Sequence, residues 1–239
     1  MSLLRRWRWV RLGRLRRQLA ERGGLDARMH RALNAELSAP SARVDGAALL
    51  AIDLEMTGLD PDRDTIISIG WVGIDDGALC LTSGDEIGLD PGEGRVGQSA
   101  TIHGLRDCDL GDGLNPAEAA ARLMQALTGR IAVFHHAPLD IGFLDRLLRR
   151  HFGFGWVWPW IDTLDWYRRR QLSRHNEAAA ASTRLDAVRD HYGLDVRDAH
   201  NAHDDAVSCA EVALILAARS RARLIDVCRL PSARRVRAG

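Results

Sequence analysis

The sequence predicts an α/β domain with a mixed five-stranded sheet flanked by helices, preceded by a basic helical N-terminal extension. Three strand-like segments follow one another through short Gly- and Asp-containing turns, which is typical of an antiparallel meander. Later strand-like segments are separated by helical ones, which makes the sheet a mixed one. The length of 239 residues is sufficient for one such domain with an appendage.

The individual elements follow from local patterns. Residues 47–52 form an apolar run with the length and character of a buried central strand. A helix begins at Asn115 and Pro116, because Asn is a favoured capping residue and Pro is favoured in a first turn. The Gly-rich segment 91–113 is longer than the loops of compact domains usually are, so it is more often functional than idle. Other strands are expected at 65–74, 78–89, 131–134 and 156–161, and other helices at 26–37, 139–150, 164–172, 183–191 and 200–217, after an Arg-rich helical stretch that ends at 22.

Charge and composition divide the chain into three regions. We assign a basic helical N-terminal extension to residues 1–45, the main domain to 46–218 and a basic C-terminal tail to 219–239. The formal net charge is +1, yet the first region has 11 Arg and 4 acidic residues, and the last has 7 Arg and 1 acidic residue. Basic ends on an acidic body indicate contact with a polyanion, without identifying the polyanion.

Several classes of protein are excluded. The hydrophobic fraction of 46% and the charged fraction of 27% are typical of ordinary globular proteins, and no apolar run approaches the roughly 18 residues of a membrane span. The Arg-rich start lacks the apolar stretch of a signal peptide. The four cysteines are scattered, which indicates free thiols and a reducing compartment. We therefore expect a cytoplasmic protein.

Two carboxylates follow the first strand. Asp53 and Glu55 are one residue apart, so the alternation of a strand directs both to the same face of the sheet. Two like charges there repel each other unless cations lie between them. A solvated pair at a sheet edge is the simpler interpretation, but open α/β sheets bind ligands at the carboxyl ends of their strands.

Two further acidic segments occur downstream. Asp140 follows the fourth strand, and a neighbouring strand would bring it close to the first pair. Asp205 follows His200 by five residues, which is little more than one helical turn along the axis. Taken singly, each Asp is only a favourable charge near a helix start.

Together these segments resemble the DnaQ-like exonuclease superfamily of the DEDDh type, over roughly residues 47–218. The stretch 53–58, reading D-L-E-M-T-G, is similar to the first motif of that superfamily, and its extension to Ile67 is closer to oligoribonuclease. The second motif, around Asp140, is closer to the proofreading type of the DNA polymerase III epsilon subunit, although His136 and Leu139 replace its usual Asn and aromatic residue. The third motif corresponds to 200–205. The implied fold is RNase H-like.

The resemblance implies an activity and its residues. The reaction would be metal-dependent 3′-to-5′ exonucleolytic release of nucleoside monophosphates from single-stranded DNA, in proofreading or repair. An alternative is trimming of RNA or short oligonucleotides, as in RNase T or oligoribonuclease, and another is an inactive adaptor for nucleic acid or a DNA polymerase. The oligomeric state stays open. His200 would be the general base, and two divalent cations, Mg²⁺ or Mn²⁺, would be held by Asp53, Glu55, Asp140 and Asp205.

The substrate contacts also come from the resemblance. Met56 and Thr57 would contact the terminal nucleotide, Leu59 would wedge against its base, and His103 would lie near its phosphate. For Leu59 a buried turn residue, and for His103 an exposed loop histidine, are equally good interpretations. His203 competes with His200 for the base role, but residues two apart on a helix do not share a face, so we interpret His203 as a surface or capping residue.

Aromatic and basic residues outside these motifs have less definite roles. The alternation of Trp156, Trp158 and Trp160 favours core positions over base stacking. The run 168–170 is a candidate for phosphate contact. The Arg-rich N-terminal arm is equally well interpreted as a nucleic-acid grip, an amphipathic helix for a partner or membrane surface, or a solvated tail.

Overall fold

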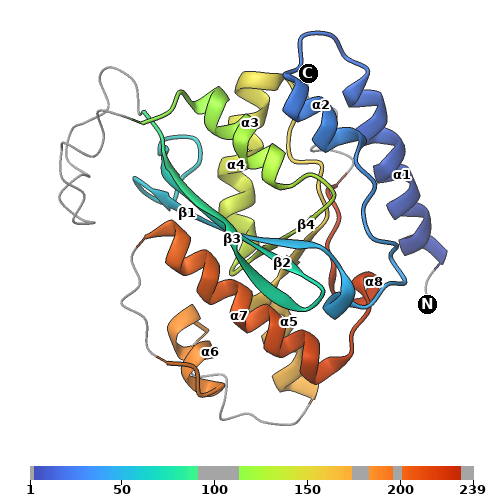
Figure 1. The fold of residues 1–239 in the computed structure, drawn as a ribbon, viewed down its shortest axis with the longest axis vertical. Helices are drawn as coiled ribbons and strands as arrows, with labels where there is room; N and C mark the ends of the chain where they lie inside the picture. Colours follow the sequence, from blue (N-terminus) through green and yellow to red (C-terminus); the bar gives the residue numbers. More distant parts are fainter. Residues whose placement is uncertain (1–2, 91–112, 174–182, 196–200, 233–239) are drawn as a thin grey trace.

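The computed structural model describes residues 3–90, 113–173, 183–195 and 201–232 (Figure 1). Its centre is a five-stranded sheet in the order β3-β2-β1-β4-β5. The pairs β1·β2 and β2·β3 are antiparallel, whereas β1·β4 and β4·β5 are parallel, so the predicted mixed sheet is confirmed. The strands are β1 (Leu49–Met56), β2 (Ile66–Asp75), β3 (Ala78–Gly88), β4 (Ile131–Phe134) and β5 (Trp160–Asp162).

Helices cover both faces of this sheet (Figure 1). The helix predicted at Asn115 is confirmed, because the Asn115 side chain accepts a hydrogen bond from the Ala117 N–H at 2.9 Å. The helices are α1 (Leu3–Ala20), α2 (Ala27–Asn34), α3 (Pro116–Ala126), α4 (Ala137–Phe152), α5 (Thr163–Ser173), α6 (Leu185–His191), α7 (Ala202–Ser220) and α8 (Leu224–Val227), with a 3₁₀ turn, η1, at Val44–Gly46.

The fifth strand is shorter than predicted. Only Trp160–Asp162 forms β5, so a strand over residues 156–161 is wrong. Pro159 has no N–H to donate to a ladder, which places the start of the strand after it. The core assignment is confirmed for Trp156 and Trp158, which are completely buried, while Trp160 is partly buried against the same cluster.

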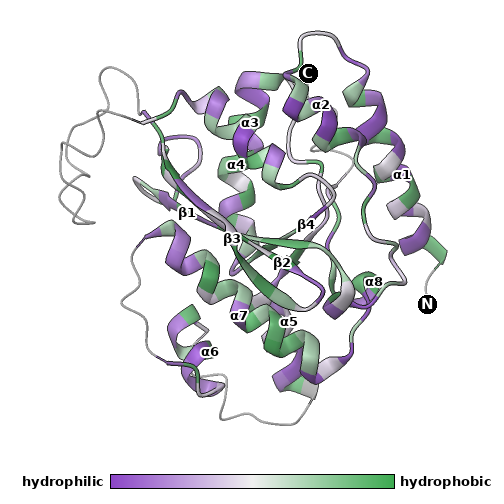
Figure 2. Ribbon diagram, viewed as in Figure 1, coloured by the Kyte–Doolittle hydropathy of each residue, from purple (hydrophilic) through white to green (hydrophobic). Residues whose placement is uncertain are grey.

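Two hydrophobic clusters lie on opposite faces of the sheet. Leu50 and Ile52 of β1 belong to the cluster with α3 and α4, whereas Leu49 and Ala51 belong to the cluster with α7. The apolar residues of α7 occupy its middle turns and hydrophilic residues flank them (Figure 2). The face of β1 that carries its odd-numbered residues is therefore the face that α7 covers.

The N-terminal arm packs on this frame. Leu12 and Leu19 of α1 are buried together with Met29 of α2 in the cluster that contains α3 and α4. Arg16 is buried as well: it donates a hydrogen bond to the Ala32 carbonyl at 2.6 Å and lies over the Trp158 ring. The interpretation of the arm as a solvated tail is therefore wrong for α1 and α2.

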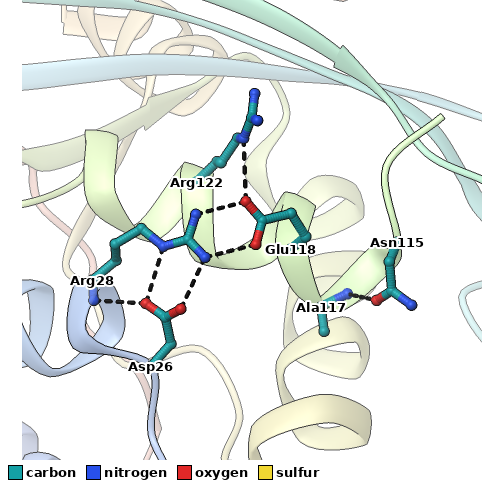
Figure 3. Close-up of polar contacts among 6 residues, drawn as sticks. All are labelled: Asp26, Arg28, Asn115, Ala117, Glu118 and Arg122. Carbon is teal, nitrogen blue, oxygen red and sulfur yellow. Dashed lines mark hydrogen bonds and ion pairs between the residues drawn. The ribbon is translucent and has the colours of Figure 1, made fainter. Parts of the chain in front are cut away.

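An ionic network connects α2 to α3 (Figure 3). Arg28 donates hydrogen bonds both to Asp26, the capping residue of α2, and to Glu118 in the first turn of α3. The hydrogen bond from Arg28 lowers the pKa of Glu118 to about 2, and that from the same side chain lowers the pKa of Asp26 to about 2. The extension is thus attached by apolar burial and by charge.

The described residues also bear on the excluded classes. No helix among them is long and apolar enough to cross a membrane. Cys80, Cys209 and Cys228 are free thiols, as predicted, and Cys108 lies outside the described residues.

Candidate active site and metal centre

The strand β1 positions the first two carboxylates. Its residues alternate between the two faces of the sheet, and Leu49 and Ala51 pack under α7. Asp53 and Glu55 continue that face beyond the apolar part of the strand, at its carboxyl end. The two charges therefore stand where the core on the α7 side ends.

The helix α7 brings Asp205 to the same place. Its N-terminus is capped by Asn201, whose side-chain oxygen accepts the Asp204 N–H at 2.7 Å. The start of the helix lies directly on β2, because a Cβ atom added at Gly70 would be 2.1 Å from the carbonyl carbon of Ala202. Gly70 is paired with Asp53 across the β1–β2 ladder. The missing side chain at Gly70 thus lets the first turn of α7 approach the acidic end of β1.

Three carboxylates converge at this point. Asp53, Glu55 and Asp205 each offer an oxygen, and these oxygens all lie within 4.8 Å of one another. Asp140, in the first turn of α4, is buried at 6% exposure, and its negative charge acts on Asp53. The structure therefore brings three of the four predicted carboxylates together from β1 and α7, and places Asp140 of α4 near enough for its charge to act on Asp53.

The carboxylates are electrostatically unfavourable without a counter-charge. Burial raises the pKa of Asp53 well above its usual value, and the neighbouring charges of Asp140 and Asp205 raise it further. Burial likewise raises the pKa of Asp140 to about 8; a hydrogen bond from its own backbone opposes this, and the charge of Asp162 adds to it. A cluster of carboxylate oxygens that resists ionisation alone is a donor set suited to hard divalent cations.

Sequence reasoning missed Glu86, a further acid of this cluster. Glu86 lies opposite Gly70 in the β2–β3 ladder, so Asp53, Gly70 and Glu86 form a row on one face of the sheet. Its carboxylate accepts the His203 N–H at 3.3 Å, and its charge contributes to the raised pKa of Asp53. No motif marks Glu86; only the register of two antiparallel ladders could have identified it.

Asp162, at the end of β5, has a structural role that its hydrogen bonds define. Its Oδ1 atom accepts the backbone N–H of His136 at 3.2 Å and that of Leu164 at 3.0 Å. His136 adopts a left-handed conformation, with φ of 73°, directly before α4. Asp162 thereby fixes the β4–α4 turn that presents Asp140.

The histidines are placed only in part. His200 and His103 lie outside the described residues. His203 is partly exposed in the first turn of α7, where Asn201 and not His203 is the capping residue. Its ring lies close to the backbone of Gly84 in β3, because a Cβ atom at Gly84 would be 2.6 Å from its Nε2 atom.

The expected substrate contacts surround the β1–β2 connection. Leu59 is 76% exposed, so the alternative of a buried turn residue is wrong. Met56 is partly buried against the core. The Thr57 hydroxyl accepts the Thr65 N–H at 3.0 Å and contacts Asp64 at 3.3 Å, so it also holds the turn together.

Comparison with known proteins identifies the class. The sequence profile of the RNase_T exonuclease family matches residues 50–213. A DNA polymerase III of PolC type from Thermotoga petrophila is 32% identical over 172 residues, which are 71% of this chain and 12% of the relative. A DNA polymerase III subunit epsilon-like protein from Rhodobacter capsulatus is 28% identical over 186 residues, 75% of this chain and 25% of the relative. The chain therefore spans a quarter or less of the length of these relatives.

Solved structures share the fold. An E. coli exonuclease I complex with single-stranded DNA superposes with a TM-score of 0.65 at 21% identity, covering 76% of this chain and 42% of the other. The cell-death related nuclease 4 superposes with a TM-score of 0.60 at 14% identity, covering 72% and 64%. The fold is thus that of an RNase H-like exonuclease. The chain belongs to the exonuclease family, within the DnaQ-like superfamily that its motifs indicated.

Proposed function

We propose that this chain is a metal-dependent 3′-to-5′ exonuclease that releases nucleoside monophosphates from the ends of single-stranded DNA. The observation that carries the proposal is the convergence of oxygens from Asp53, Glu55 and Asp205 within 4.8 Å, beside the buried Asp140. An all-carboxylate donor set favours Mg²⁺ or Mn²⁺ over softer cations. Two such cations, when bound, lower the pKa of an attacking water and stabilise charge on the attacking and leaving oxygens.

The chain's own residues hold this arrangement in place. Asp53 and Glu55 sit on a central strand, and Asp205 on the first turn of a 19-residue helix, so the ligands are carried by rigid elements. Asp140 approaches from α4 on the other side of β1, because β4 is the parallel neighbour of β1. The four carboxylates would therefore reach the proposed cation site from three separate elements.

We assign proton transfer from the attacking water to His200. An imidazole with an ordinary pKa near 6.5 is suited to accept a proton at neutral pH. His203, whose ring lies against β3, serves as the matched comparison. We expect His200→Ala to remove the rising limb of the pH–rate profile near neutrality and His203→Ala to retain it; the reverse result would move the base role to His203.

The polarity, the strand type and the terminal contacts are part of the proposal. Relatives named as DNA polymerase III proteins, and a structural neighbour solved with single-stranded DNA, support DNA as the first substrate and a polymerase as a candidate partner. Leu59, exposed on the β1–β2 connection that follows Glu55, supports a contact with the terminal base, together with Met56 and Thr57.

A turnover assay tests the proposal. The purified chain is incubated with 5′-labelled single strands of DNA and of RNA, with Mg²⁺, with Mn²⁺ or with EDTA. We expect a ladder shortening from the 3′ end only with metal, faster on DNA, and its loss by at least a thousandfold in Glu55→Gln and Asp205→Asn. A faster RNA ladder would select RNA trimming, and no turnover with intact strand binding would select the adaptor role.

A further inference from the structure

A cavity of about 540 Å³ lies at the edge of the domain beside β5, and none of Asp53, Glu55, Asp140 and Asp205 lines it. It is enclosed by α1, by the start of α4, by β5 with the beginning of α5, and by the C-terminal segment after α8. The arm is fastened there, because the Arg5 guanidinium donates a hydrogen bond to the Ile225 carbonyl at 2.7 Å. The two basic ends of the chain thus meet at one cavity, which neither the exonuclease motifs nor the metal site explains.

The cavity has excess positive charge. Arg5 and Arg8 of α1, Arg168 of α5 and Arg229 of the C-terminal segment all line it. Within the described residues, Arg5, Arg8 and Arg168 form no ion pair, whereas Arg229 is paired with Asp165 at 2.6 Å. Arg168 donates only to the neutral Thr183 hydroxyl, at 3.0 Å.

The acidic groups of the cavity are already satisfied. Asp165 accepts from Arg229 and is also paired with Arg169 of its own helix, at 3.1 Å. Asp162 accepts backbone N–H groups at the starts of α4 and α5. Among the described residues that line the cavity, four arginines therefore face two carboxylates, and a ligand phosphate would balance the remaining positive charge.

Aromatic residues line the same cavity. Trp9 comes from α1 and Trp160 from β5, and both are partly buried. Indole rings stack on nucleobases, and arginines beside them bind the phosphate. A volume of 540 Å³ also lies within the range of roughly 300 to 1,000 Å³ found for small-ligand pockets.

We propose that this cavity is a second nucleotide-binding site, in which Arg8 and Arg168 bind a phosphate and Trp9 or Trp160 stacks on the base. The site lies at the carboxyl ends of β4 and β5, the same sheet edge as the metal centre, since β1, β4 and β5 run parallel. His136 and Pro138 line it, and Asp140 follows them on α4. The nucleotide is either an internal position of the strand or the released monophosphate. Both candidates rest on the proposed exonuclease function.

The test measures binding without cleavage. Fluorescence anisotropy of labelled dT12 and calorimetry with dTMP and with inorganic phosphate are recorded in EDTA, for the full chain and for Arg8→Gln/Arg168→Gln. The matched control is Arg14→Gln/Arg150→Gln, which removes the same charge from two exposed arginines that do not line the cavity. Arg5 is left unchanged because it fastens α1 to the C-terminal segment.

We expect the cavity variant to weaken dT12 or dTMP binding at least tenfold and the control less than threefold. For dT12, the slope of log Kd against log salt should fall by about 0.7, the value for one neutralised phosphate on a single strand. If the cavity variant weakens the binding of dT12 alone, the site binds an internal position of the strand. If it weakens the binding of dTMP, the site binds the released product. Equal weakening by both variants, or phosphate binding as tightly as dTMP, would overturn the proposal. Turnover is measured separately, so an inactive chain that still binds through the cavity would reject only the exonuclease function.

Discussion

Substitution of Asp140 by Asn should stabilise the metal-free protein increasingly as pH rises. The pKa of Asp140 is raised from 3.8 to about 8, mainly by burial. In such a case the folded state binds the proton more tightly than the unfolded state, so stability is greatest below pH 4 and falls as pH rises towards 8. Asparagine has nearly the same shape and no charge to ionise, and it therefore removes this loss.

The size of the effect follows from the shift. One pKa unit corresponds to 1.36 kcal/mol, and the interval from pH 5 to pH 7.5 lies between the unfolded and the folded pKa of Asp140, so the stability changes by about 3 kcal/mol over that interval. Relaxation and water penetration reduce such costs, and we expect the advantage of Asp140→Asn over the unmodified chain to grow by about 2 to 3 kcal/mol over that interval.

Urea unfolding in EDTA, followed by tryptophan fluorescence, provides the measurement. Asp190→Asn is the control, because it removes the same charge from an exposed residue. Its free energy of unfolding, relative to that of the unmodified chain, should stay constant within about 0.5 kcal/mol over the same pH interval. In saturating Mg²⁺ the unmodified chain should regain stability, by about 2.7 kcal/mol at a hundred times Kd, and Asp140→Asn less. A pH-independent advantage for Asp140→Asn would refute the argument that this carboxylate is held against its preferred charge state.

Two further predictions concern the frame around the site. Gly70→Ala places a Cβ atom 2.1 Å from the Ala202 carbonyl carbon and must displace the start of α7, so we expect turnover to fall by about a hundredfold. Gly88→Ala is the control: its Cβ would have no atom within 4 Å, and we expect turnover to be unchanged. Arg28→Met breaks the α2–α3 network. Because the pKa of Glu118 is held at about 2, we expect the thermal midpoint of the variant to be a few degrees below that of the unmodified chain at pH 7 and equal to it near pH 2. A difference that persists at pH 2 would assign the loss to packing.

The sequence was sufficient for the parts of the fold that depend on local patterns. The apolar run before Asp53 and the cap at Asn115 each report a short-range preference: a strand formed over most of that run and continued to Met56, and a helix began directly after Asn115. The strand predicted over residues 156–161 shows the limit: alternating Trp residues satisfied the strand pattern, yet β5 begins only after Pro159 and tertiary packing buries Trp156 and Trp158.

Features that depend on distant contacts were beyond such patterns. The burial of Arg16 against Trp158 needs α1 to be docked, and an Arg-rich helix with exposed apolar residues gives no sign of which side is covered. Glu86 reaches the acidic cluster only through the pairing of three strands. Arg8 of α1 and Arg168 of α5 line one cavity although they are far apart in sequence.

The register of β1 is what makes one strand serve both the core and the site. Its even-numbered residues, such as Ile52 and Leu54, pack under α3 and α4, and the odd-numbered face carries Asp53 and Glu55. A shift by one residue would exchange these faces and bury two carboxylates in an apolar cluster. The β1–β2 ladder is regular from Leu49 through Glu55 and becomes irregular only between Glu55 and Met56. The strand thus keeps its alternation through the second carboxylate, and the irregularity falls where the chain turns away from the sheet.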